Sequence, residues 1–195
     1  MSLKNLSDDN LLEGMKKSYA NAVELLDEAH LLFNSKKYSR AYSLCQLSIE
    51  EFAKAPLLFG VLMERLEGLE IDYEKYDHDF KNHEKKMEHG IEWEIAMFKK
   101  FKHDTGKDFI DKTMEKSEEF LTKIKEFNNL KNESLYVHIK NNSFQTPSEI
   151  FDEKKYESIV GIASLRKLML QVFGKFDDKS LADLKKAINE DDGSK

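Results

Sequence analysis

"RAYSLCQLSIEEFAKAPLLFGVLMERL", residues 40–66, is apolar on nearly every side when it is drawn as a helix. A helix with one apolar stripe lies at the surface of a bundle, whereas a helix that is apolar all round lies at its centre. We therefore expect this segment to form the central helix of an α-helical bundle.

The flanking segments carry helix-start signals. Ser7 can cap a helix that begins at Asp8. Later in the chain, Thr146, Pro147 and Glu149 combine a cap, a proline at the first helical position and a capping-box glutamate. Both places therefore predict the beginning of a helix.

The remaining pattern predicts an all-α fold. Outside the central segment, helical periodicity covers about residues 8–35, 72–101, 108–134 and 147–174, with a short last helix from Ser180. Residues 102–108 and 137–145 are expected to be loops, no segment is predicted to be a strand, and the tail at about 190–195 is expected to fray. The sequence thus predicts a single domain over residues 1–195, built as a bundle of five to six helices.

Composition excludes several classes of protein. The net charge of −6 gives no basic footprint over the surface as a whole, so any contact with nucleic acid must be local. Cys45 is the only cysteine, which excludes an internal disulfide and a thiolate metal site. The first ten residues lack a signal-peptide core, and the apolar run at 55–63 is shorter than the roughly 20 residues of a membrane span. We expect a cytoplasmic protein without membrane contact.

Charges interrupt the apolar central segment. Glu50 and Glu51 stand four and three residues before Lys54, so either carboxylate can pair with the ammonium on one helical face. Such charges are costly in apolar surroundings unless they are paired or face a wet pocket. They therefore indicate either a buried ion pair that fixes packing or the wall of a polar site.

A histidine lies on the apolar stripe of the segment at 72–101. His83 shares this stripe with Phe80, Met87 and Ile91, so we expect it to point inward, either as a hydrogen-bonded core residue or as a catalytic group. No HExxH motif occurs, and no glutamate stands three residues before any histidine. The sequence therefore predicts no metal site of either kind.

The stretch "EFNNLKNESLYVHIKNN", residues 126–142, ends an apolar stripe in a cation. The stripe of Phe120, Ile124 and Phe127 continues at Lys131, with Asn132 beside it and His138 seven residues after the lysine. One interpretation is a helix C-terminus, where Lys and His complement the dipole. The other is a site in which an imidazole transfers a proton of a ribose 2′-OH and a cation stabilises the phosphoryl transition state. We expect the helix to end near residue 134 and the chain to bring His138 back towards Lys131.

Three segments resemble the AbiV family of abortive-infection proteins, a branch of the HEPN superfamily. They are "AYSLCQLSIEEFAKAP" (41–56), "HDFKNHEKK" (78–86) and "LKNESLYVHI" (130–139), and the resemblance covers about residues 15–175. It implies an all-α HEPN-like bundle, often dimeric, that shuts down bacterial growth when a phage infects the cell.

The resemblance also implies a site. HEPN ribonucleases carry an arginine, a polar neighbour and a histidine after four to six intervening residues, and they use no metal or cofactor. Lys131, Asn132 and His138 match these positions, with a lysine that keeps the charge but lacks the planar fork of arginine. The implied roles are phosphate stabilisation for Lys131, orientation for Asn132 and proton transfer for His138. The supporting positions are Glu50, Glu51, Lys54, His83 and Tyr136.

Two functions remain open from the sequence. The first is a metal-independent endoribonuclease that arrests translation as a homodimer, with apolar contacts from Phe127, Leu135, Tyr136 and Phe144. The second is a non-catalytic module that binds a phage protein or the translation machinery. The expected partners are RNA, a second copy of the chain and a phage-encoded activator protein.

Overall fold

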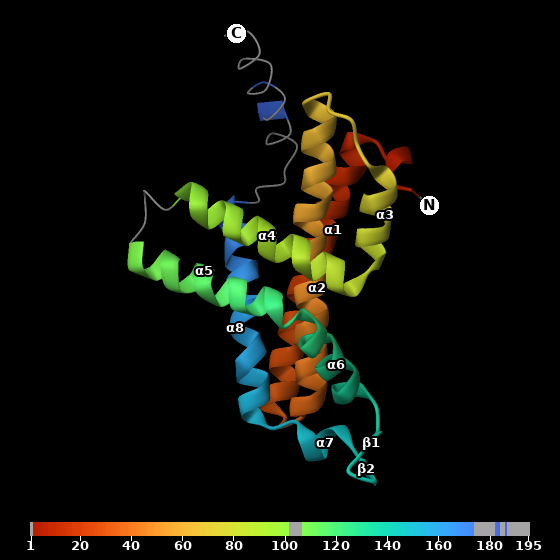
Figure 1. The fold of residues 1–195 in the computed structure, drawn as a ribbon, viewed down its shortest axis with the longest axis vertical. Helices are drawn as coiled ribbons and strands as arrows, with labels where there is room; N and C mark the ends of the chain where they lie inside the picture. The colour runs from red at the N-terminus through yellow and green to blue at the C-terminus, as the bar shows by residue number, and fades with distance from the viewer. Residues whose placement is uncertain (1, 102–106, 174–181, 184–185, 187–195) are drawn as a thin grey trace.

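The computed structural model of the protein describes residues 2–101, 107–173, 182–183 and 186, which are mostly helical (Figure 1). The helices are α1 (Asp8–Asn34), α2 (Tyr38–Leu66), α3 (Tyr73–Lys81), α4 (His83–Phe101), α5 (Lys107–Thr122), α6 (Ile124–Leu135), α7 (Pro147–Ile150) and α8 (Glu153–Phe173). A short 3-10 helix, η1 (Leu3–Asn5), precedes them, and a hairpin of β1 (His138–Lys140) and β2 (Ser143–Gln145) follows α6. The all-α class is confirmed, with more helices in the described residues than the expected five to six.

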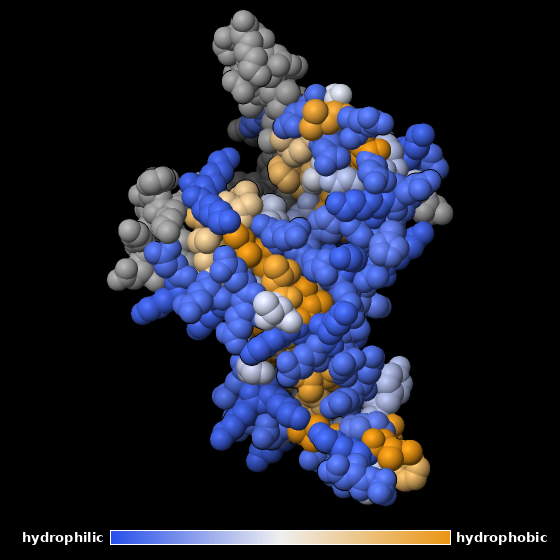
Figure 2. Space-filling view, viewed as in Figure 1, coloured by the Kyte–Doolittle hydropathy of each residue, from blue (hydrophilic) through white to orange (hydrophobic). Residues whose placement is uncertain are grey.

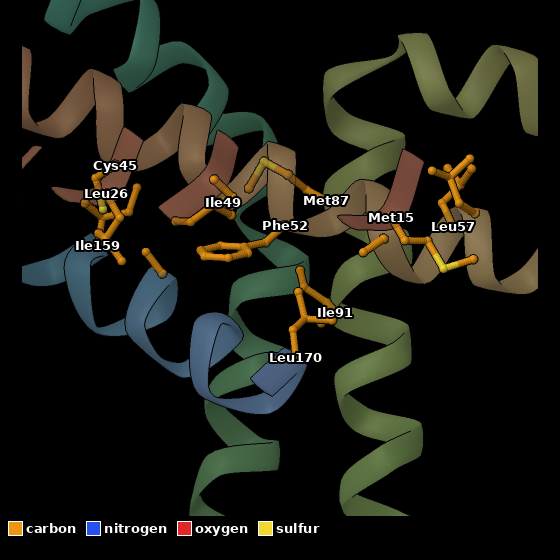
Figure 3. Packing of buried hydrophobic residues seen from close by; sticks show 14 of the residues in the cluster. Met15, Leu26, Cys45, Ile49, Phe52, Leu57, Met87, Ile91, Ile159 and Leu170 are labelled. Atoms are coloured by element: carbon orange, nitrogen blue, oxygen red, sulfur yellow. The ribbon is translucent and has the colours of Figure 1, made fainter. Parts of the chain in front are cut away.

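Helix α2 is the central element. It packs against α1, α4, α6 and α8, and Figure 1 shows α1 and α2 side by side along the long axis with α4 crossing them. Phe52 of α2 is fully buried between the helices, and Figure 3 shows it among Ile49, Ile91 and Leu170. The central position predicted for residues 40–66 is therefore confirmed.

Helix α1 follows its predicted pattern closely. The Ser7 hydroxyl accepts a hydrogen bond from the backbone N–H of Asn10, so the expected cap is present. Its apolar residues at helical spacing are buried at Leu12, Met15, Ala22, Leu26 and Ala29 and partly buried at Tyr19 and Phe33. The capping box at Thr146 and Glu149 is also present.

The helix expected over 72–101 is two helices. Asn82 between them is extended, with φ −85° and ψ 123°, so its backbone cannot continue α3. Its side-chain oxygen accepts hydrogen bonds from the backbone N–H groups of Glu84 and Lys85 and thereby caps α4. The prediction of one helix was wrong because the Asn82 side chain caps the free backbone N–H groups at the start of a second helix.

Two further predicted helices are also divided. Lys123, with φ −106° and ψ 8°, separates α5 from α6. Phe151 is extended between α7 and α8, and the Asp152 carboxylate accepts from the backbone N–H of Lys155 in the first turn of α8. Lys123 alone lies between α5 and α6, whereas Phe151 and Asp152 lie between α7 and α8, and at both places the chain leaves the helical conformation.

The loop expected at 137–145 is a β-hairpin instead. Ile139 pairs with Phe144 across the antiparallel strands. Asn141 and Asn142 connect the strands with φ of 51° and 59°, and asparagine tolerates this left-handed region better than most residues. A two-residue turn with both φ positive matches the twist of a hairpin, so the prediction of no strand was wrong here.

Some predictions lie outside the described residues. These are the start of a last helix at Ser180, the tail at about 190–195 and most of the loop expected at 102–108. In the described part of the chain, no helix is long and apolar enough to cross a membrane.

The crossing of α4 over α2 can be tested at Gly90. A Cβ at this position would lie 2.9 Å from the Cβ of Ala53 and 3.3 Å from the Cζ of Arg166. We expect Gly90→Ala to lower the free energy of unfolding by about 1–3 kcal/mol because the close approach is lost.

The matched control is Gly161→Ala, since a Cβ at Gly161 meets no atom within 4 Å. It should raise the free energy of unfolding by about 0.5–1 kcal/mol through helix propensity. Urea unfolding of both variants measures the two effects, and a change of the same sign in both would refute the close α2–α4 contact.

Candidate functional site

The buried carboxylate of Glu50 on α2 joins side chains from two other helices. Lys131 Nζ on α6 donates to Glu50 Oε1 at 2.6 Å. His83 Nδ1 on α4 makes a short hydrogen bond with Glu50 Oε2, and Lys86 Nζ lies 4.0 Å from the same oxygen. We call Glu50, His83, Lys86 and Lys131 the Glu50 cluster.

Helix α6 positions Lys131 by the same stripe that its sequence predicts. Ile124, Lys131 and Ser134 are its buried residues. The hydroxyl of Ser134 donates to the carbonyl of Lys131, and it lies 2.6 Å from the hydroxyl of Ser43 on α2. The helix is thus held against α2 by polar contacts next to the lysine, and the core-facing position of Lys131 is confirmed.

His83 lies at the edge of the bundle, where α4 begins. Its side chain is 53% exposed, so the predicted inward orientation was wrong for the ring as a whole. The reason is the break at Asn82, which makes His83 a terminal residue of its helix. Because Nδ1 faces the Glu50 carboxylate, Nε2 is the ring nitrogen that does not contact Glu50.

Lys86 is the member of the cluster that the sequence did not indicate. Its side chain is 7% exposed. Burial lowers the pKa of Lys86 from its usual value, and the attraction of Glu50 only partly opposes this effect. The spacing of three residues from His83 was the available signal, because it places both side chains on one face of α4.

Glu51 and Lys54 form a separate pair. Glu51 Oε1 lies 2.5 Å from Lys54 Nζ, and the two side chains are 19% and 20% exposed. The ammonium of Lys54 also lies 5.3 Å from the centre of the Phe80 ring. The charges on α2 therefore divide into two groups. Glu51 and Lys54 form a partly solvated pair within α2, whereas Glu50 pairs with side chains of other helices.

The other predicted site residues lie beyond the end of α6 or on its surface. Asn132 and Tyr136 are exposed. His138 begins β1, and neither nitrogen of its ring has a hydrogen-bond partner in the part of the chain that the structure describes. The structure therefore brings Glu50, His83 and Lys131 together, and it shows no bond between His138 and Lys131 among these residues.

A second histidine cluster lies at the α3–α4 junction. The buried Asp79 carboxylate contacts His78 Nδ1 at 3.0 Å and His89 Nε2 at 2.9 Å. Burial alone would raise the pKa of Asp79, but the hydrogen bonds and charges of the two histidines outweigh burial and hold this pKa below its usual value. Within the described residues, no group of three or more His, Cys, Asp or Glu side chains is placed to hold a metal ion.

Another buried pair lies between α4 and α8. Arg166 Nε donates to Glu94 Oε1 at 2.5 Å, and Arg166 Nη1 donates to the carbonyl of Ile49 at 3.1 Å. Burial raises the pKa of Glu94 even though Arg166 lowers it. Glu94 also lines a cavity of about 400 Å³ between α4, α5 and α8, which contains no member of the Glu50 cluster.

Comparison with known proteins supports one family. The family model HEPN_AbiV, described as AbiV, matches residues 10–167. The matched range includes the whole Glu50 cluster and His138. No curated protein and no solved structure matches the chain.

The burial of the Glu50 cluster gives a test of its energetics. Glu50→Gln removes the charge that neutralises Lys131 in buried surroundings, so we expect the free energy of unfolding to fall by about 3–5 kcal/mol. Glu51→Gln, the matched control on the next residue, should cost at most about 1 kcal/mol because its pair is partly solvated. Urea denaturation measures both variants. An equal loss of unfolding free energy in Glu50→Gln and Glu51→Gln would contradict the stronger, buried pairing of Glu50.

Proposed function

The chain belongs to the AbiV family of HEPN proteins, which act in phage defence by abortive infection, and from this we propose that it is a metal-independent endoribonuclease. The observation that supports the proposal is the Glu50 cluster. A single carboxylate holds an exposed imidazole and a buried ammonium side by side. Cleavage of RNA at the ribose 2′-OH needs a group that takes a proton and a cation that stabilises the phosphate.

In the proposed reaction, His83 Nε2 takes the proton of a ribose 2′-OH. The 2′-oxygen attacks the adjacent phosphorus, the bond to the 5′-oxygen breaks, and the protonated imidazole returns its proton to that leaving oxygen. The products are a 2′,3′-cyclic phosphate and a 5′-hydroxyl. Glu50 acts as a positioning residue, because a carboxylate at Nδ1 favours the tautomer with a free Nε2 and stabilises the imidazolium.

Lys131 supplies the positive charge in this proposal. An ammonium has three N–H donors, and Glu50 Oε1 takes one of them. The others remain for the phosphate oxygens. A lysine acts there as a point charge rather than as the planar fork of an arginine.

The proton-transfer role is proposed for His83 in preference to His138. His83 has an exposed ring and a carboxylate partner. His138, the histidine that the family motif indicates, has both ring nitrogens buried and unpartnered among the described residues. Asn132 keeps its proposed orienting role on the exposed surface of α6.

The RNA of expressing cells tests this assignment. We expect His83→Ala to lower the rate of RNA cleavage by about 100-fold or more, because general acid–base catalysis contributes about that much. His78→Ala, a control at an exposed histidine of α3, should cleave as the wild type does. A loss in His138→Ala with full activity in His83→Ala would move proton transfer to the motif histidine. Growth arrest without RNA cuts in the wild type would favour the binding module.

An exposed apolar surface on the hairpin supports both a homodimer and that second function. Its residues, the hairpin patch, are 57–77% exposed and comprise Tyr136, Val137, Ile139 and Phe144. Figure 2 shows this apolar surface at one end of the molecule, over β1 and β2. Large apolar side chains gathered on a surface are typical of protein interfaces. We place a second copy of the chain on it, because the patch follows directly on α6, and a two-fold axis there would pair the two sites.

The predicted contact residues divide between the core and the patch. Phe127 is partly buried, with its ring 4.3 Å from the Phe120 ring, and it belongs to the core of its own chain. Leu135 is half-buried at the end of α6. Tyr136 and Phe144 are exposed and remain the proposed contacts.

Light scattering at micromolar concentration tests the homodimer. The wild type should show about twice the 22.8 kDa of one chain, and Phe144→Ser should return the mass to that of one chain. Leu31→Ser is the matched control, since Leu31 is an exposed residue of α1 outside the patch. A wild-type mass that stays at that of one chain would refute the homodimer. The patch would then be the binding surface for a phage-encoded activator, and Phe144→Ser should abolish binding of that activator.

A further inference from the structure

The side chain of Lys86 is largely buried, and its ammonium has no close acceptor among the described residues. Its ionic contact is Glu50 Oε2 at 4.0 Å, which is too long for a hydrogen bond, and its side chain is 7% exposed. No hydrogen bond of this ammonium to the described residues is present. A charged group with three donors on a largely buried side chain is costly unless an anion or water accepts its hydrogen bonds.

The nearby carboxylates are already used. Glu50 Oε1 accepts from Lys131, and Glu50 Oε2 contacts His83. Glu51 pairs with Lys54 at 2.5 Å. Glu50 therefore faces two ammonium groups, so the cluster has an excess of one positive charge even when His83 is neutral. This local excess stands out on a chain whose net charge is −6.

We infer that the Glu50 cluster binds one phosphate group, and that Lys86 is a ligand of this phosphate together with Lys131. The exposed ring of His83 marks the side from which the anion enters. Charge-assisted hydrogen bonds from two ammonium groups would satisfy the donors that Glu50 leaves open. The inference rests on the proposed function only for the source of the phosphate, which is the backbone of RNA.

The lowered pKa of Lys86 agrees with this site. Burial is its largest cause, while Glu50 and Glu51 act in the opposite direction and Lys54 and Lys131 add to the lowering. A bound phosphate adds negative charge beside the ammonium. The pKa of Lys86 should therefore rise when phosphate binds.

Calorimetric titration with inorganic phosphate tests the site. The wild type should bind phosphate, and Lys86→Met should weaken the affinity by about tenfold or more, as expected for the loss of one charge-assisted contact. The matched control is Lys85→Met, which removes the same charge from the adjacent exposed lysine that pairs with Glu88. Its affinity should stay within about twofold of the wild type. Equal affinity in Lys86→Met and the wild type, or a wild type that binds no phosphate, would overturn the inference.

A measurement on the wild type guards against a variant that fails to fold. Carbon NMR of the Lys86 side chain follows its titration with and without phosphate. A rise in its pKa on addition of phosphate supports the site. An unchanged titration means that water alone meets the ammonium and overturns the inference.

The source of the phosphate is tested by competition. An RNA oligonucleotide with 2′-O-methyl riboses cannot be cleaved at the 2′ position, and it should displace inorganic phosphate from the wild type. Displacement by this RNA supports RNA as the source of the phosphate. If the wild type binds inorganic phosphate but does not bind the RNA, RNA is excluded as that source. Phosphate binding without RNA cleavage would leave the anion site standing and reject the ribonuclease, so the two failures are distinguishable.

Discussion

The contact between Glu50 and Lys131 is the interaction on which the candidate site depends. It joins the central helix α2 to α6 through two side chains that are almost entirely buried. Removing both charges from water is costly, and the attraction between them repays this only with good geometry. The 2.6 Å bond provides that geometry for one oxygen, and His83 uses the other. Breaking this pair would leave an uncompensated buried charge, so the geometry of the cluster depends on it.

The fold supports this cluster with rigid packing on both sides. Phe52 and Ile49 of α2 fill the core next to Glu50, and the close approach at Gly90 holds α4 against the same helix. The hydroxyls of Ser43 on α2 and Ser134 on α6 lie 2.6 Å apart and hold α6 against α2. A polar group in such surroundings has little freedom to move, so its partners meet it in one arrangement. This preorganisation is what a proton-transfer group and a phosphate-binding cation require.

The family and the site have different kinds of support. The match to HEPN_AbiV covers most of the chain and places it among the proteins of abortive infection. The reaction depends on individual side chains, and fold alone does not define chemistry. The motif indicates Lys131 and His138, whereas the packed structure pairs Lys131 with Glu50 and sets His83 beside it. The hairpin that carries His138 instead exposes apolar side chains.

The sequence by itself determined the helical class, the central position of residues 40–66, the start of α1 after Ser7 and the inward position of Lys131. These features depend on apolar periodicity and on a capping residue, both of which are local in the chain. The breaks at Asn82, Lys123 and Phe151 and the hairpin were missed, because each depends on the conformation of one or two residues. Only the tertiary structure decided that Glu50 rather than Glu51 forms the buried pair and that Lys86 joins it. Those contacts link residues 33 to 81 positions apart, and their partners are chosen by how α4 and α6 pack on α2.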